Sequence, residues 1–190
     1  MKKLAIFASG NGSNAQNITE YFKGSKSACI SLIISNKPEA YVLERASALG
    51  VPAAVLPREQ LTAESPVELL SLLEANCIDY IILAGYLLKI PAALVEAYPG
   101  RIINIHPALL PKFGGKGMYG RHVHQAVIDS AETESGITIH LVDSNYDSGS
   151  TIFQATCPVL PDDTPDSLAQ RIHILEKEHF ARVIEEYICK

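Results

Sequence analysis

The chain lacks the features that mark membrane, secreted and nucleic-acid-binding proteins. No apolar run approaches the roughly 20 residues of a membrane-spanning helix. The N-terminus has no apolar segment followed by a cleavage site, so we expect no signal peptide and no membrane association. Positive charge is not in excess either. The net charge is -5, which argues against general affinity for nucleic acid or anionic membrane.

A paired arrangement of cysteines is also missing. The four cysteines are far apart in the chain and form no CxxC pair: Cys29, Cys77, Cys157 and Cys189. This spacing favours reduced thiols in a cytoplasmic protein over a disulfide framework or a zinc site. No other cluster of ligand-type residues calls for a metal, so we expect none.

The composition that is present is typical of a globular protein. Of the 190 residues, 47% are apolar and 19% are charged, which suits a packed core and not a disordered chain. No linker, repeat or low-complexity tract marks a domain boundary. We therefore expect one domain over residues 1–190.

Strand-like and helix-like segments alternate without a break from Lys3 to His106. Short apolar runs predict strands at 3–9, 28–35, 51–56, 78–84 and 102–106. Apolar residues at helical spacing predict helices after the first strand and at about 39–49, 65–75 and 91–98. This alternation predicts an α/β fold with a Rossmann-like, doubly wound, mainly parallel sheet.

After Pro111 the sequence pattern changes from alternating strand and helix segments to a loop, a helix and a hairpin-like pair of strands. A glycine-rich loop at 113–120 precedes a helix predicted over 121–130. Segments 135–142 and 150–159 flank a polar loop and predict a hairpin-like antiparallel extension of the sheet. Pro165 then suits the first turn of a long final helix that runs to about Ile188.

The first strand ends in the turn Gly10-Asn11-Gly12-Ser13-Asn14. Glycines let the backbone approach a ligand, and the first N–H groups of the following helix point at it. The turn lacks the third glycine of a dinucleotide fingerprint because position 15 is Ala, so it favours a mononucleotide-type phosphate. The alternative is a tight turn with a helix cap and no ligand.

The strand at 102–106 carries Asn104 and His106, which alternation places on one face. An amide and an imidazole side by side can polarise a carbonyl group and move a proton. The alternative is a buried polar pair satisfied by backbone partners. The apolar loop at 85–90 follows another strand, and such loops line ligand sites in open α/β sheets.

Five motifs together resemble the phosphoribosylglycinamide formyltransferase family of folate-dependent enzymes. They are GNGSN at 10–14, SNKPEAYVLERA at 35–46, LAGYLLKI at 83–90, NIHPALLPK at 104–112 and DSG at 147–149. The N-x-H-P and D-x-G elements are shared with methionyl-tRNA formyltransferase and formyltetrahydrofolate deformylase. Those relatives carry an extra domain for which we expect no room here, and the GNGSN turn distinguishes the family.

The resemblance implies transfer of a formyl group from 10-formyltetrahydrofolate to glycinamide ribonucleotide in purine synthesis, without a metal. Residues 1–100 would form the nucleotide-binding half and residues 101–190 the folate and catalytic half. The implied catalytic residues are Asn104, His106 and Asp147. The implied ribonucleotide site is Gly12, Ser13, Asn14 and Glu176. The implied folate pocket is Leu87, Leu88, Lys89, Ile90 and Asn104, with the 142–147 loop.

The sequence also departs from the family pattern. Lys89 stands one place after the family's usual basic residue, and a folate-side arginine of some members has no counterpart around Glu64. The 113–120 loop is longer than in some members, so His122 and His124 are left outside the catalytic set, and solvated or capping roles are expected for most of their imidazole groups. Asp143 is interpreted as a solvated carboxylate, because Asp147 has the D-x-G spacing.

The sequence leaves several alternatives open. Thr138 stands where the family has a hydroxyl near the catalytic group, but threonine is also common in strands. Another formyl-folate enzyme is one competing function, and a nucleotide-binding sensor without catalysis is another. We expect small-molecule substrates, no nucleic-acid partner, and a monomer or homodimer.

Overall fold

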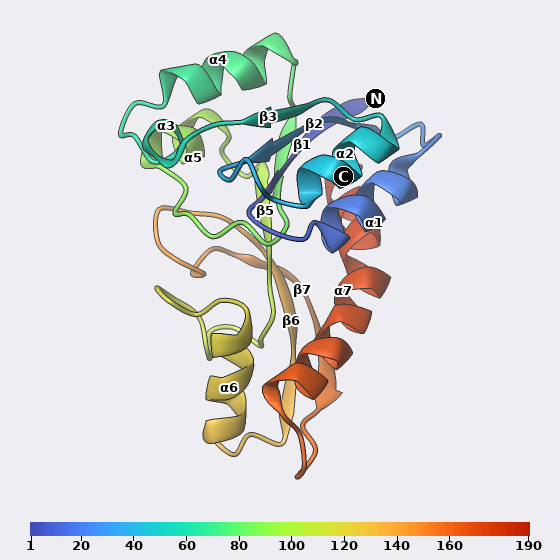
Figure 1. Cartoon of the computed structure of the whole chain (residues 1–190), viewed down its shortest axis with the longest axis vertical. Helices are drawn as coiled ribbons and strands as arrows, with labels where there is room; N and C mark the ends of the chain where they lie inside the picture. The colour runs from blue at the N-terminus through green and yellow to red at the C-terminus, as the bar shows by residue number, and fades with distance from the viewer.

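Seven strands form one sheet in the order β3-β2-β1-β4-β5-β6-β7. The computed structural model describes all 190 residues (Figure 1). The strands are β1 (Lys2–Ala8), β2 (Ala28–Ser35), β3 (Ala53–Val55), β4 (Tyr80–Leu83), β5 (Ile102–His106), β6 (Glu134–Leu141) and β7 (Thr151–Pro158). The first five strands run parallel, and β6 and β7 pair antiparallel at one edge. The prediction of a mainly parallel sheet with an antiparallel extension is therefore confirmed.

Helices pack on both faces of this sheet. They are α1 (Ser13–Phe22), α2 (Val42–Leu49), α3 (Arg58–Leu61), α4 (Val67–Ala75), α5 (Ala92–Ala97), α6 (Arg121–Asp129) and α7 (Pro165–Ile188). Alternate side chains of β1 point to opposite faces of the sheet and belong to two hydrophobic cores. Leu4 and Ile6 pack beneath α1, α2 and α7. Ala5 and Phe7 pack beneath α3, α4 and α5. None of the helices combines the length and apolar character that a membrane crossing requires.

Strand order reverses between β1 and β4, because β2 and β3 lie on one side of β1 and β4 and β5 on the other. Open α/β sheets bind ligands outside the carboxyl ends of the strands at such a reversal. Ser9 ties the two loops together here: its backbone N–H donates to Gly85, and its hydroxyl accepts from the N–H of Leu87 at 3.1 Å. The switch point therefore positions two of the predicted ligand loops side by side.

Strand β5 leads from the core into the polar site. Ile102 belongs to the core beneath α4 and α5, and Asn104 and His106 follow on the same face. The antiparallel register sets Asn104 opposite His140 of β6 and His106 opposite Thr138. Pairing β5 with β6 thus brings four polar side chains to one face of the sheet.

The predicted elements are present with modest differences at their ends. Helix α2 begins at Val42 and not at 39, because residues 38–41 form a turn before it. The short helix α3 was not predicted, and its single turn gives too few residues for a periodic signal. The final helix begins at Pro165 as expected, with Thr164 accepting a hydrogen bond from the backbone of Ser167 as its N-cap.

Candidate active site

A single cleft of about 1460 Å³ lies along the carboxyl ends of β1, β4 and β5. Its walls include the Gly10–Asn14 turn, the loop from Gly85 to Ile90, and the end of β5 with Asn104 and His106. Asp147 and Glu176, which are remote in sequence, also line it. All residues predicted to bind substrate or to act in catalysis therefore border one space.

The turn after β1 has the backbone geometry of an anion site. Gly12 has φ +77°, and a Cβ at this position would lie 2.5 Å from Cγ2 of Val42. No side chain caps helix α1, so its first N–H groups are free of a side-chain partner. These donors, with Ser13 and Asn14, can hold a phosphate.

Helix α2 supports this turn from behind. The Val42 N–H donates to the Gly10 carbonyl at 3.1 Å. Arg45 donates from Nε to the Asn11 carbonyl at 2.8 Å and from Nη2 to the Asn11 side chain at 2.9 Å. Its Nη1 also donates to Gln16 of α1. The guanidinium therefore connects the turn to two helices.

Glu176 reaches the turn from α7. Its side chain is buried, and its Oε2 accepts from Asn14 Nδ2 at 3.0 Å and from His173 Nδ1 at 2.9 Å. The hydrogen bond from His173 raises the pKa of that imidazole. Both donors use the same oxygen, so Glu176 Oε1 has no protein donor. The carboxylate can therefore accept from a hydroxyl of a ligand seated on the turn.

At the other end of the cleft, His140 fixes the amide of Asn104. Burial lowers the pKa of His140, so the ring is neutral at pH 7. Its Nδ1 lies 2.8 Å from the Leu141 carbonyl, which makes Nδ1 the protonated nitrogen. Nε2 then accepts from Asn104 Nδ2 at 3.0 Å. One amide hydrogen of Asn104 is thus fixed, and the other remains available.

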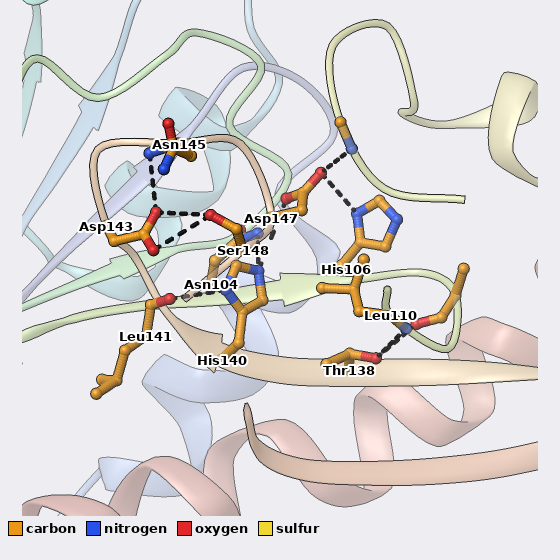
Figure 2. A network of polar contacts seen from close by, with 12 residues as sticks. Asn104, His106, Leu110, Thr138, His140, Leu141, Asp143, Asn145, Asp147 and Ser148 are labelled. Carbon is orange, nitrogen blue, oxygen red and sulfur yellow. Dashed lines mark hydrogen bonds and ion pairs between the residues drawn. The ribbon is translucent and has the colours of Figure 1, made fainter. Parts of the chain in front are cut away.

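His106 lies between two acceptors. Its Nε2 is 2.8 Å from the carbonyl of Phe113, and its Nδ1 is 3.7 Å from Oδ2 of Asp147 (Figure 2). Both ring nitrogens can donate at once only in the protonated ring. Because the side chain is 3% exposed, these two partners control its orientation.

Asp147 joins the cluster from the loop between β6 and β7. It has φ +52°, and its Oδ2 accepts from the backbone N–H of Gly115 at 2.9 Å. Its Oδ1 lies 3.7 Å from His140 Nε2. Figure 2 shows the carboxylate directed toward His106 and the glycine-rich loop. The carboxylate is therefore hydrogen-bonded to that loop and lies beside both histidines.

The glycine of the D-x-G element is required by close packing. A Cβ on Gly149 would lie 1.9 Å from the Leu141 carbonyl oxygen, where no side chain fits. Asp143 accepts from Asn145 N–H at 2.8 Å and from Ser148 Oγ at 3.0 Å. The interpretation of Asp143 as a merely solvated carboxylate is therefore incomplete, because it holds the loop in shape.

Thr138 is buried and its hydroxyl is fully engaged. It donates to the Ala108 carbonyl at 2.7 Å and accepts from Leu110 N–H at 3.0 Å and Gln154 Nε2 at 2.9 Å. These bonds hold the segment after His106 against β6 (Figure 2). Its position thus supports the loop, and no hydrogen-bonding capacity remains for a substrate.

The loop after β4 forms the apolar wall of the cleft. Leu87 to Ile90 line it, with Leu87 exposed and Ile90 buried. The Lys89 ammonium lies 5.8 Å from the ring centre of Tyr146, which belongs to the opposite loop. Burial raises the pKa of Tyr86, whose hydroxyl has no partner beside this wall. A flat apolar ligand with polar edges fits such a surface.

Two histidines of the site were missed or misplaced by sequence reasoning. His140 was not singled out, although strict alternation in SGITIHLV places it on the face of Thr138. The expectation of a solvated or capping role was wrong for His124, which is 4% exposed and lines the cleft. His122 is exposed, as expected. No group of three or more His, Cys, Asp or Glu residues could hold a metal ion.

Fold and site together define an α/β protein with a phosphate-type turn beside an amide, imidazole and carboxylate cluster. A family model described as formyl transferase matches residues 2–184. A chloroplastic phosphoribosylglycinamide formyltransferase of Arabidopsis thaliana is 46% identical over 182 residues, which cover 94% of this chain. The match spans 62% of the Arabidopsis protein and 60% of its Vigna unguiculata counterpart, so the chain spans about three fifths of these plant relatives.

Bacterial relatives match over nearly their whole length. Phosphoribosylglycinamide formyltransferase of Bacillus subtilis is 37% identical, with 99% of this chain and 95% of that protein covered. The crystal structure of glycinamide ribonucleotide transformylase 1 from Geobacillus kaustophilus superposes with a TM-score of 0.90 at 37% identity, covering 99% of each chain. The chain belongs to the formyl transferase family, among the phosphoribosylglycinamide formyltransferases.

Proposed function

We propose that this chain transfers the formyl group of 10-formyltetrahydrofolate to the amine of glycinamide ribonucleotide. The products are formylglycinamide ribonucleotide and tetrahydrofolate, in purine synthesis. One observation carries the proposal: a single cleft joins the phosphate-type turn to Asn104, His106 and Asp147. A sensor would need the turn alone, whereas a transferase needs both ends.

The ribonucleotide occupies the end of the cleft formed by α1 and α7. Its phosphate accepts from the backbone of Gly12 and Ser13 and from the Asn14 side chain. Glu176, with one oxygen free of protein donors, accepts from the sugar. The formyl-folate lies against Leu87, Leu88, Lys89 and Ile90, with its formyl group toward Asn104. The two substrates thus meet at the end of β5.

Attack of the amine on the formyl carbon creates a tetrahedral intermediate with a developing oxyanion. The free amide hydrogen of Asn104 donates to this oxygen, and such a preorganised donor contributes about 3 kcal/mol to transition-state stabilisation. Protonated His106 becomes a second donor when its Nε2–H leaves the Phe113 carbonyl. It passes this proton to the folate nitrogen as the bond between the formyl carbon and that nitrogen breaks, and the neutral imidazole then takes up the proton that the amine loses, directly or through water. Asp147 stabilises the imidazolium and orients it.

We propose that residues 1–190 act as one formyltransferase domain, with the ribonucleotide half at 1–100 and the catalytic half at 101–190. The sheet supports this, because β4 and β5 pair across the boundary. Glu176 crosses it in the other direction, from α7 to the phosphate turn. We also propose a reducing compartment such as the cytoplasm, in keeping with four unpaired cysteines. Fractionation of the native cells tests the location.

The reaction is tested by following the folate chromophore with both substrates and with each alone. Transfer predicts consumption of 10-formyltetrahydrofolate only when glycinamide ribonucleotide is present, with one formylated product per folate released. Equal consumption without the amine would instead indicate a deformylase. Binding of the ribonucleotide without any effect on formyl-folate would contradict a catalytic role.

A further inference from the structure

His124 on α6 is a buried imidazole that the reaction scheme above leaves unused. Its side chain is 4% exposed, and its Nδ1 is buried without a hydrogen-bond partner. It nevertheless lines the cleft that holds the phosphate turn and the catalytic cluster. A buried polar atom without a partner at a ligand site points to a ligand that supplies one.

The surroundings of His124 define which chemistry it can bind. Burial lowers the pKa of the ring, and His173 and His106 lower it further, whereas Glu176 and Asp166 oppose them. The ring is therefore neutral at pH 7, with one donor and one acceptor nitrogen. A neutral imidazole suits a hydroxyl or an amide better than a phosphate.

The neighbours of His124 also place it along the cleft. Helix α6 packs against α7, and His124 lines the same cleft as His173 and Glu176, of which Glu176 accepts from Asn14 of the phosphate turn. His106, beside which the formyl group would be transferred, lines the same cleft. Between the phosphate and the reacting amine, glycinamide ribonucleotide presents its ribose and its amide. His124 therefore stands beside the uncharged middle of this substrate.

We propose that His124 is a ribonucleotide-binding residue whose ring hydrogen-bonds the ribose, next to the free oxygen of Glu176. This inference rests on the proposed function, since it assigns part of the same substrate. A ribose hydroxyl can donate to one group and accept from another, which matches a carboxylate beside an imidazole. The pair would distinguish a ribonucleotide from a simple phosphate ester.

Two substitutions separate binding from packing. His124→Phe keeps the ring volume without the nitrogens, and His124→Asn places an amide near the position of Nδ1. We expect His124→Phe to weaken ribonucleotide binding about tenfold, with kcat and the folate KM nearly unchanged. His124→Asn should recover most of this loss. His122→Gln is the matched control, because His122 is exposed on the same helix and should leave binding unchanged.

The His124 imidazole can also be observed directly by NMR. In protein with 15N-labelled histidine, ribose 5-phosphate should shift the His124 Nδ1 resonance, and inorganic phosphate should not. Unchanged ribonucleotide affinity in a folded His124→Phe variant would overturn the inference. So would equal losses for both substrates together with a lowered melting temperature in both variants, which is the result expected for packing alone.

The two proposals can fail independently. A wild-type protein that does not transfer formyl groups would contradict the proposed function, while the ribose 5-phosphate titration would still report on His124. An active wild-type enzyme whose His124 resonance ignores ribose 5-phosphate would contradict only the assignment of His124.

Discussion

The proposed phosphate end and the proposed catalytic end of the cleft differ in the groups that form them. The phosphate end uses the backbone of a continuous turn at 10–14, supported by Arg45 and Val42 of α2. The catalytic end uses side chains that β5, β6 and the loop before β7 bring together. Backbone donors are fixed by a local conformation, whereas converging side chains depend on strand pairing. The ends should therefore respond differently to substitution.

The largest effect is expected at the catalytic end. His106→Ala and Asp147→Asn should each lower kcat by about 10²- to 10⁴-fold, because they remove the proton carrier or its partner. Ribonucleotide affinity should change little, since neither residue touches the phosphate turn. Steady-state kinetics and calorimetric titration measure the two quantities.

Asp162→Asn is the control, because Asp162 is exposed and remote. Wild-type turnover in Asp147→Asn would remove Asp147 from the mechanism.

At the phosphate end, backbone geometry should matter more than side-chain chemistry. Gly12→Ala introduces a Cβ 2.5 Å from Val42 Cγ2 at a φ of +77°, a strain of roughly 1–3 kcal/mol. We expect ribonucleotide affinity to fall about 10- to 100-fold with kcat at saturation largely kept. Gly24→Ala is the matched control, since Gly24 has a similar φ of +78° but no atom lies within 4 Å of its Cβ. Equal effects of the two variants would show that the turn is not rigidly packed.

Arg45 offers a finer test of the support behind the turn. Arg45→Met removes its bonds to Asn11 and Gln16, and we expect the ribonucleotide KM to rise about tenfold at unchanged kcat. The difference should disappear with a substrate analogue that lacks the phosphate. Arg182→Met serves as control, because the Arg182 guanidinium hydrogen-bonds Glu186 and His179 of its own helix and not the turn. A KM effect that persists with the phosphate-free analogue would assign Arg45 to general stability.

The smallest expected effect is the pH dependence of folding stability, which has opposite signs at the two ends of the cleft. Burial lowers the pKa of His140. Below about pH 6.5 the unfolded chain therefore binds a proton that the folded chain does not, and the free energy of unfolding decreases as the pH falls toward the lowered pKa. At the phosphate end Glu176 raises the pKa of His173, whose contribution is complete below 6.5 and lost as pH rises through the raised value.

Denaturant unfolding at pH 5.5 and 7.5 measures this difference. His140→Gln should reduce the acid loss of stability by about 1 kcal/mol, because no buried imidazole remains to be protonated there. His173→Gln should steepen the acid loss slightly, and the exposure of His173 keeps that effect small. An acid loss unchanged by His140→Gln would show that other groups control it.

Local signals in the sequence predicted the secondary structure of the proposed phosphate end. The turn, the helix after it and the strand before it are consecutive, so their geometry follows from glycine placement and apolar periodicity. The support from Arg45 was not predicted, because only the packing of α2 beside the turn makes it visible. The catalytic end was predicted through motif resemblance more than through periodicity.

The misplacement of His124 shows where sequence reasoning stopped. A spacing of two residues indicated that His122 and His124 face different directions, but not which of them faces inward. That choice depends on how α6 packs against α7, a contact between segments about 40 residues apart along the chain. His140 depended likewise on the register that sets it opposite Asn104.

The sequence by itself determined the alternation of strands and helices, the glycine turn, and the amide and imidazole pair of β5. Each of these is encoded within a short segment by steric and hydrophobic periodicity. Only the tertiary structure decided that the register of β6 sets His140 opposite Asn104, that Asp147 lies 3.7 Å from His106, and that Glu176 reaches Asn14. Such contacts join residues far apart in the chain, so they exist only once the sheet and the final helix have packed.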